Sequence, residues 1–296
     1  MEHLNDTAKK WLNLSNTERI LKCKEQLWIG YPRALQVLDK LEDVLDHPKS
    51  LRMPNMLVIG ETNNGKTVLV NRFVSKHKHY IRETDNSLIL PVLLIQAPPR
   101  PDEKRFYNSL LDNLGAVYKF NDHIDKKQYQ VMRLLERMET KVLIVDEFHH
   151  ILAGTPSAQR VFLNVIKYIS NELQISIVGA GIKDAYYAIN ADPQLGNRFE
   201  VASLPSWKPD DDFLRLLASF ERLIPLGQPS NLIREELAMK IFTMSDGKLG
   251  EISTIIKKAA ILAIENGKEY IDTKVLGAID YIPQSKRKNQ LNQVGF

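Results

Sequence analysis

Short apolar runs alternate with stripes of apolar residues at helical spacing along the first two thirds of the chain. Four of these runs, at residues 56–59, 88–95, 142–145 and 175–178, predict strands, and a fifth strand is predicted at 199–204. Nearly continuous apolar runs are typical of strands that are buried on both faces of a sheet. Strands that alternate with helices build a parallel sheet with right-handed crossovers. The pattern therefore predicts an α/β fold in which helices flank a five-stranded parallel sheet.

Two prolines refine this picture. Pro91 lies inside the second apolar run. A proline cannot donate to a sheet ladder, so we expect the strand at 88–95 to lie at an edge of the sheet. Pro32 can open a helix from its first turn. The apolar stripe that follows it consists of Leu35, Leu38, Leu41 and Leu45.

Both ends of the chain differ from the alternating region. Residues 1–27 are polar and basic, with scattered apolar residues that predict a helical arm. From residue 207 onward every strong pattern is helical, and Asp272 is expected to cap the last helix. We therefore divide the chain into an arm (1–27), an α/β core (28–206), a small helical lid (207–283) and a basic, flexible tail (284–296).

The composition is that of an ordinary globular protein, with 44% hydrophobic and 26% charged residues among 296. The net charge of +4 permits contact with an acidic polymer without demanding it. The single cysteine, Cys23, excludes a disulfide framework and fits a reducing compartment. No apolar run approaches the roughly 18 residues of a membrane span. We therefore expect a cytoplasmic protein.

The first strand leads into the pattern G-x-x-x-x-G-K-T, which is the P-loop motif between a strand and a helix. The backbone N–H groups of such a loop surround a polyphosphate, which predicts ATP as the ligand. Lys66 would reach the β- and γ-phosphates, and the Thr67 hydroxyl would bind Mg²⁺. The residues expected to contact the nucleotide here are Gly60, Glu61, Thr62, Asn63, Asn64, Gly65, Lys66, Thr67 and Val68.

The third strand ends in two acids, Asp146 and Glu147. In P-loop ATPases the first acid holds Mg²⁺ and the second polarises the attacking water. Adjacent acids could also be mere surface charge, but a P-loop upstream favours the catalytic interpretation.

His149 and His150 follow directly. Because no cysteine or third histidine is near, we interpret them as loop or packing residues rather than as a metal site.

The segment at 28–32 has two interpretations that the sequence leaves open. It could lie against the adenine just ahead of the P-loop region, with Ile29 and Tyr31 as contacts. It could equally be an aromatic packing turn.

Together with an arginine just before the fifth strand, these motifs resemble an AAA+ ATPase. The resemblance narrows to the TniB proteins of bacterial transposons and covers residues 28–283. The segments that carry it are 28–34, 52–55, 62–67, 171–175, 197–200 and 217–222. TniB is related to the transposition regulator TnsC. The resemblance implies ATP-dependent assembly into a ring or filament on duplex DNA, and delivery of that DNA to a DDE transposase and a TniQ-type protein.

The resemblance also implies roles for two further residues. Arg198 would reach the nucleotide of a neighbouring protomer, although a contact that caps its own strand is a competing role. Gln96, at the end of the second strand, would link the nucleotide state to DNA contact by bonding Glu147.

For DNA contact, the resemblance favours the loops after the second strand and after the helix that follows it. The basic residues there are Arg100, Lys104 and Lys119. Nothing in the chain resembles a groove-reading helix or a zinc finger, so contact should follow the phosphate backbone. The alternative for each residue is an ordinary solvated side chain.

Two departures from the AAA+ pattern concern hydrolysis. The fourth strand ends in Gly179-Ala180-Gly181, where many AAA+ proteins carry a polar residue that senses the γ-phosphate. In the lid, Lys248 is the nearest substitute for a sensing arginine, and Glu251 would repel phosphate. We therefore expect slow, DNA-stimulated hydrolysis, with ATP acting mainly as an assembly switch.

Two other functions compete with a transposition regulator. A replication initiator or helicase-loader relative would share the ATPase but take a helicase as its partner. A small-molecule kinase would share the P-loop alone. The Asp146–Glu147 pair favours water as the acceptor, and the chain lacks an arginine-rich phosphate lid, so the kinase is the weaker alternative.

Overall fold

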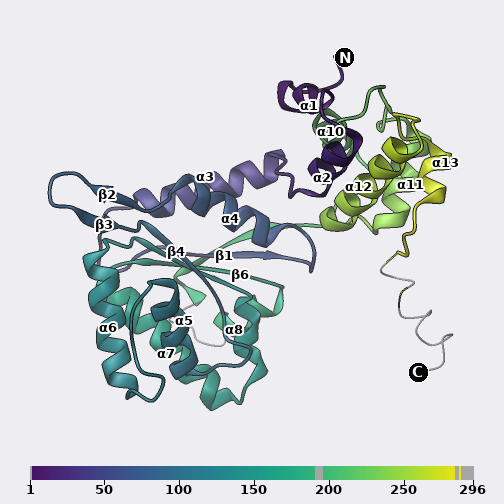
Figure 1. The fold of residues 1–296 in the computed structure, drawn as a ribbon. Coiled ribbons are helices and arrows are strands. Elements are labelled where there is room, and N and C mark those ends of the chain that lie inside the picture. The colour runs from purple at the N-terminus through teal and green to yellow at the C-terminus, as the bar shows by residue number, and fades with distance from the viewer. Residues whose placement is uncertain (1, 191–195, 284–286, 288–296) are drawn as a thin grey trace. The chain divides into compact units, whose positions relative to one another are not determined.

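The computed structural model describes residues 2–190, 196–283 and 287. The chain forms two compact units (Figure 1). One unit comprises Pro32–Leu204, and the other combines Met1–Tyr31 with Pro205–Phe296. Each unit is described by itself below.

The Pro32–Leu204 unit is built on a parallel sheet of five strands, in the order β4-β5-β6-β1-β7. The strands are β1 (Asn55–Gly60), β4 (Val92–Gln96), β5 (Val142–Asp146), β6 (Ser176–Gly181) and β7 (Phe199–Leu204). The central strands are buried because helices cover both faces, as their continuous apolar runs require. The predicted five-stranded parallel sheet is confirmed.

Helices flank the sheet on both sides (Figure 1). One face carries α3 (Pro32–Asp46) and α4 (Lys66–Lys76). The other carries α5 (Glu103–Asn113), α6 (Ile124–Arg137), α7 (Pro156–Leu173) and α8 (Asp184–Asn190). A 3₁₀ helix, η1 (Phe148–Ala153), follows β5. The core beneath the second group includes an edge-to-face pair, Phe106 and Phe162, whose ring centroids lie 4.9 Å apart.

The apolar run at 88–95 is divided between two strands, which corrects the sequence prediction. Its first part is β3 (Ser87–Ile89), which pairs antiparallel with β2 (Tyr80–Arg82) in a separate hairpin. Only after Pro91 does the chain join the main sheet, as β4. Pro91 cannot donate a hydrogen bond, but its carbonyl accepts one from Lys141 N at 2.9 Å. The expected edge position is confirmed, because β4 is an edge strand.

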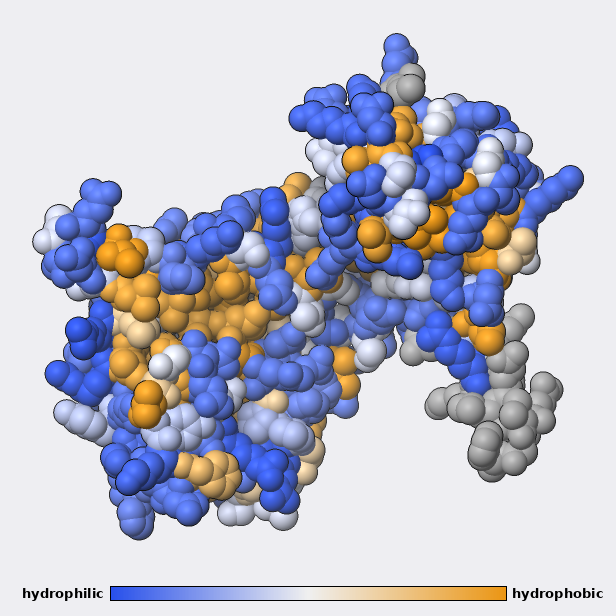
Figure 2. Space-filling view, in the orientation of Figure 1, coloured by the Kyte–Doolittle hydropathy of each residue, from blue (hydrophilic) through white to orange (hydrophobic). Residues whose placement is uncertain are grey.

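The hairpin adds apolar surface to this unit. Figure 2 shows orange apolar side chains among the blue hydrophilic ones over the region of the sheet. On the hairpin, Ile81 and Leu88 are both exposed.

No described helix in either unit is long and apolar enough to cross a membrane.

Over its described residues, the regular structure of the second unit is helical. Its helices are α1 (Asp6–Trp11), α2 (Asn16–Lys24), α10 (Asp211–Leu223), α11 (Glu235–Ser245), α12 (Leu249–Glu265) and α13 (Thr273–Ala278). Asp272 caps α13 by accepting a hydrogen bond from Val275 N, as predicted. Helix α10 buries an apolar stripe of Phe213, Leu216, Leu217 and Phe220.

The domain division differs from the one expected, because the arm packs into the same unit as the lid. Arg19 on α2 is only 6% exposed. Its guanidinium donates to Glu269 Oε1 at 3.0 Å and to the carbonyl of Pro225. The hydrogen bond from Arg19 is also the main reason why the pKa of Glu269 is lowered. Apart from Arg287, the expected tail at 284–296 lies outside the described residues.

We predict that Arg19→Ala lowers the free energy of unfolding of this unit by about 2–4 kcal/mol, because it leaves a buried carbonyl without its donor and a partly buried carboxylate without its cation. The measurement is equilibrium urea unfolding followed by circular dichroism. Lys24→Ala is the matched control, since Lys24 is an exposed residue of the same helix. It should change stability by less than about 0.5 kcal/mol.

The same pair gives a pH dependence. The folded pKa of Glu269 lies below its ordinary value of 4.5. The contribution of the pair should therefore be complete at neutral pH and be lost as the pH falls below about 4.5. The difference between wild type and Arg19→Ala should shrink over that range. A difference that is independent of pH would show that packing and the hydrogen bonds to the Pro225 carbonyl, and not the ion pair, join arm and lid.

Candidate nucleotide-binding site

The loop between β1 and α4 is held in a conformation that its residue types permit. A Cβ at Gly60 would lie 2.7 Å from the carbonyl oxygen of Leu204, so only glycine fits there. Asn63 and Gly65 both have positive φ angles, of 62° and 85°. The Asn64 side chain is buried and donates to the same Leu204 carbonyl at 2.8 Å. The loop is thereby tied to the end of β7.

Lys66 lies inside this loop and is 7% exposed. Its Nζ donates to the carbonyl oxygens of Gly60 at 2.9 Å and Glu61 at 2.8 Å. Burial lowers the pKa of Lys66, and the nearby carboxylates of Glu147, Asp146 and Glu61 oppose that effect. The site thus holds a desolvated cation that an anionic ligand would stabilise.

Asp146 joins the loop to the end of β5. Its Oδ2 accepts a hydrogen bond from the Thr67 hydroxyl at 2.8 Å, across 79 positions of sequence. Its Oδ1 accepts from the Glu147 N–H, also at 2.8 Å. A hydroxyl and a carboxylate side by side are the hard oxygen ligands that Mg²⁺ takes in proteins, so this donor set fits the expected metal.

Glu147 leaves the strand in the left-handed region, with a φ of 54°. Its Oε2 lies 3.4 Å from His149 Nε2. Gln96 is level with Asp146 in the adjacent strand. Its side chain is exposed, and no hydrogen bond joins it to Glu147 among the described residues. The contact expected between Gln96 and Glu147 is therefore not formed in this structure.

His149 and His150 lie beside Glu147, whereas the sequence indicated only loop or packing residues. Glu147, His149 and His150 each offer a ligand atom, and these atoms lie within 4.8 Å of one another. Imidazole and carboxylate groups at this spacing could hold a transition-metal ion. Burial lowers the pKa of His149, with the Glu147 carboxylate opposing it. In the sequence, this contact could have been predicted from the position of His149 two residues after Glu147, because a tight turn between them brings the imidazole back to the carboxylate.

A family model described as Bacterial TniB protein matches residues 19–209, which is more than half of the chain. The chain belongs to the TniB family. No curated protein matches it in sequence.

Solved structures similar to this TniB family member show the AAA+ P-loop fold. The Aeropyrum pernix ORC2 protein, solved as ADPNP-ADP complexes, is 15% identical with a TM-score of 0.60, over 86% of this chain and 69% of that one. The Aeropyrum pernix ORC1 protein in complex with DNA is 15% identical with a TM-score of 0.56, over 88% and 68%. Cdc6p from Pyrobaculum aerophilum is 15% identical with a TM-score of 0.58, over 87% and 68%.

Arg198 of this TniB family member lies far from the P-loop of its own chain. It directly precedes β7, and its carbonyl accepts from Asn55 N at the start of β1. Because the strands are parallel, Arg198 is at the amino edge of the sheet, whereas Lys66 follows the carboxyl edge. A strand of six residues is about 20 Å long. The Arg198 guanidinium donates to Asn171 Oδ1 at 2.7 Å.

The three basic residues expected to contact DNA lie near the start of α5 and on the α5–α6 loop. Arg100 and Lys119 are exposed. Lys104 Nζ lies 5.1 Å from the ring centroid of Phe120, the neighbour of Lys119, so the start of α5 lies beside the α5–α6 loop. Phe120 is itself 71% exposed. Within the described part of the chain, none of the three cations forms an ion pair.

In the helical unit, the lid residues have other contacts than the sequence indicated. Glu251 is buried and accepts hydrogen bonds from the Tyr281 hydroxyl and from Arg287. It is therefore not the free carboxylate expected to repel phosphate. The ring of Tyr31 packs edge-on against Trp207 at 5.0 Å, and Ile29 packs against the same core. Their contact with adenine stays a prediction.

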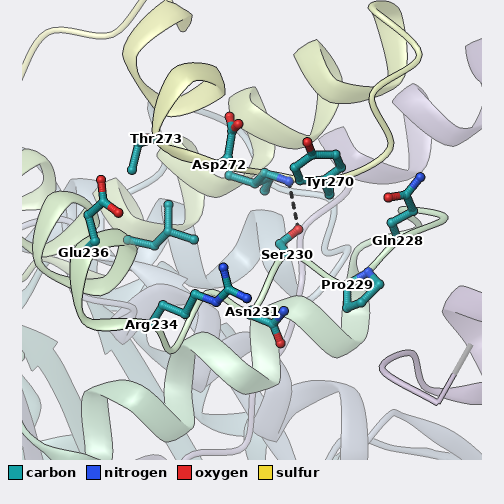
Figure 3. A pocket seen from close by; sticks show the side chains of 11 residues that line it. Gln228, Pro229, Ser230, Asn231, Arg234, Glu236, Tyr270, Asp272 and Thr273 are labelled. Atoms are coloured by element: carbon teal, nitrogen blue, oxygen red, sulfur yellow. Dashed lines mark hydrogen bonds between the residues drawn. The ribbon is translucent and has the colours of Figure 1, made fainter.

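The helical unit also contains a polar cavity of about 270 Å³ (Figure 3). It is lined from two segments, by residues of 228–237 and 270–273. Ser230 Oγ accepts from Ile271 N at 2.9 Å, and Asp272 caps α13. Much of its polar lining therefore already serves the local backbone, and we assign the cavity no ligand.

Proposed function

We propose that this TniB family member is an ATP-dependent, DNA-binding AAA+ regulator of transposition. It would assemble on target DNA as a ring or helical filament and recruit or activate a DDE transposase together with a TniQ-type protein. The observation that carries the proposal is the arrangement of Lys66, Thr67, Asp146 and Glu147 around one loop. The family match supports the link to transposition.

In this proposal, the backbone of residues 60–68 surrounds the ATP phosphates at the N-terminus of α4. Lys66 exchanges its two carbonyl acceptors for phosphate oxygens. Thr67 and Asp146 hold Mg²⁺, which neutralises charge on the phosphates when it is bound. Glu147 orients the attacking water and accepts its proton. ATP would act mainly as an assembly switch, with slow hydrolysis that DNA stimulates.

The position of Arg198 supports a role between protomers. A side chain at the amino edge of the sheet cannot serve a site at the carboxyl edge of the same six-residue strand. It is free to meet the nucleotide of a second copy, in an assembly where one protomer's amino edge faces the next protomer's P-loop. The bond to Asn171 would then hold the arginine until assembly.

The alternative is a replication initiator or helicase-loader-like ATPase, and the observation that favours it is the likeness to ORC and Cdc6 structures. That likeness is one of fold alone at 15% identity, whereas the TniB model matches this sequence directly. A helicase recovered as the partner, in place of a transposase, would select the alternative.

The nucleotide site is tested by comparing two variants. Lys66→Ala should weaken ATP binding by about 100-fold, because it removes charge-assisted contacts to two phosphates, and DNA-dependent assembly should fail with it. Glu147→Gln keeps the size of the side chain and should bind ATP and DNA, but turn over about 100-fold more slowly. Fluorescent-nucleotide titration and phosphate release are the measurements. Wild-type affinity in Lys66→Ala would overturn the assignment of the P-loop.

Arg198→Ala should bind ATP normally but hydrolyse it up to about 1,000-fold more slowly. Because Glu147→Gln protomers keep Arg198, mixing the two inactive variants should restore hydrolysis at the junctions between them. Asn171→Ala is the control, since it removes the partner seen within the chain. If mixing restores nothing and Asn171→Ala reproduces the loss, Arg198 acts inside its own chain.

The DNA surface is tested through its salt dependence. Each phosphate that Arg100, Lys104 or Lys119 neutralises should contribute about −0.9 to the slope of log affinity against log salt. Replacing one of them by Ala should reduce the slope by about 1 per contact in the ATP-bound state, alike on two unrelated duplexes. Lys141→Ala is the control, because exposed Lys141 precedes β5 at the opposite edge of the sheet. An unchanged slope would show that the three residues are ordinary solvated side chains that do not contact DNA phosphates.

A further inference from the structure

The end of β6, where many AAA+ proteins carry a polar residue that senses the γ-phosphate, lies directly beside His149 of η1. Val145 pairs with Gly179, and Gly181 ends β6 two residues further on. A Cβ at Gly181 would lie 3.3 Å from His149 N and 3.5 Å from His149 Nδ1. The absence of a side chain at 181 therefore makes room for His149, which contacts the place where a polar residue of β6 would project.

The His149 side chain also lies close to the Glu147 carboxylate. The left-handed turn at Glu147 leads into η1 and brings His149 Nε2 to 3.4 Å from Glu147 Oε2. A carboxylate only accepts hydrogen bonds, so a neutral imidazole must carry its proton on Nε2 to stabilise it. A distance of 3.4 Å is long for a hydrogen bond, but catalytic contacts commonly shorten once substrate is bound. Gln96, the residue expected in this role, makes no bond to Glu147.

We propose that His149 is a positioning residue for ATP hydrolysis, which holds the Glu147 carboxylate toward the attacking water in place of the polar residue missing from the end of β6. The proposal rests on the proposed ATPase function. His149 would not take the proton of the water, which passes to Glu147. It would fix the direction in which the Glu147 carboxylate points.

The two histidines allow a sharp comparison. His150 is the neighbour of His149 in η1, and their ring centroids lie 4.9 Å apart. Both have a buried Nδ1 without a hydrogen-bond partner in the described structure. Among the described residues, His149 is the histidine whose Nε2 lies 3.4 Å from Glu147 Oε2. A metal ion held by Glu147 and both histidines is the competing explanation for the cluster, and it requires both rings equally.

The experiment measures kcat, KM and ATP affinity for four variants under saturating Mg²⁺. His149→Leu should lower kcat about 10- to 100-fold, as expected when a reacting group is misplaced, with KM and affinity nearly unchanged. His149→Gln places an amide donor near Nε2 and should recover most of kcat. His150→Leu should change kcat less than twofold. In the Glu147→Gln background, His149→Leu should cause no further loss, because its effect passes through the carboxylate.

Each contrary outcome identifies what is wrong. Equal losses in His149→Leu and His150→Leu would favour the metal site over the positioning role. A further loss from His149→Leu in the Glu147→Gln background would show that His149 acts without Glu147. A wild-type kcat in His149→Leu would overturn the proposal while leaving the ATPase intact. If wild type itself neither binds nor hydrolyses ATP, the proposed function fails instead.

Discussion

The Asp146 carboxylate accepts hydrogen bonds on both of its oxygens, and the geometry of the site depends on these two bonds. One comes from the Thr67 hydroxyl and one from the Glu147 backbone. The strand order places β6 between β5 and β1, so the first bond reaches across a strand. That strand ends in Gly181, beside which Ala185 and His149 pack. The Thr67–Asp146 bond thus joins the P-loop to the acidic strand end.

The parallel sheet places the nucleotide site and Arg198 at opposite edges, although the proposed function requires the two to act together. The carboxyl edge carries the P-loop and both acids, and the amino edge carries Arg198. A protomer with its site at one edge and an arginine at the other would be incomplete alone, and complete only beside a second copy. This polarity gives a physical reason why nucleotide binding and assembly would depend on each other.

The sequence by itself determined the elements and residues whose cause is local. Short, largely apolar segments marked the five strands of the sheet, although the segment at 88–95 is divided between β3 and β4. Pro91 marked the edge strand, and Asp272 marked a helix cap. The P-loop spacing and the Asp146–Glu147 pair marked the site, because each is a short motif at the end of a strand. Periodicity and capping act within one or two turns of chain, so they can be read without knowledge of the fold.

Contacts between distant segments were decided only by the tertiary structure. The burial of Arg19 against Glu269 depends on a partner 250 positions away in sequence. Burial of Glu251 beneath Tyr281 changed the environment of a residue whose type alone suggested an exposed charge. The place of His149 depends on a glycine 32 positions later, in a neighbouring strand. No local pattern encodes such a contact, because it exists only once the strand order brings β5 and β6 together.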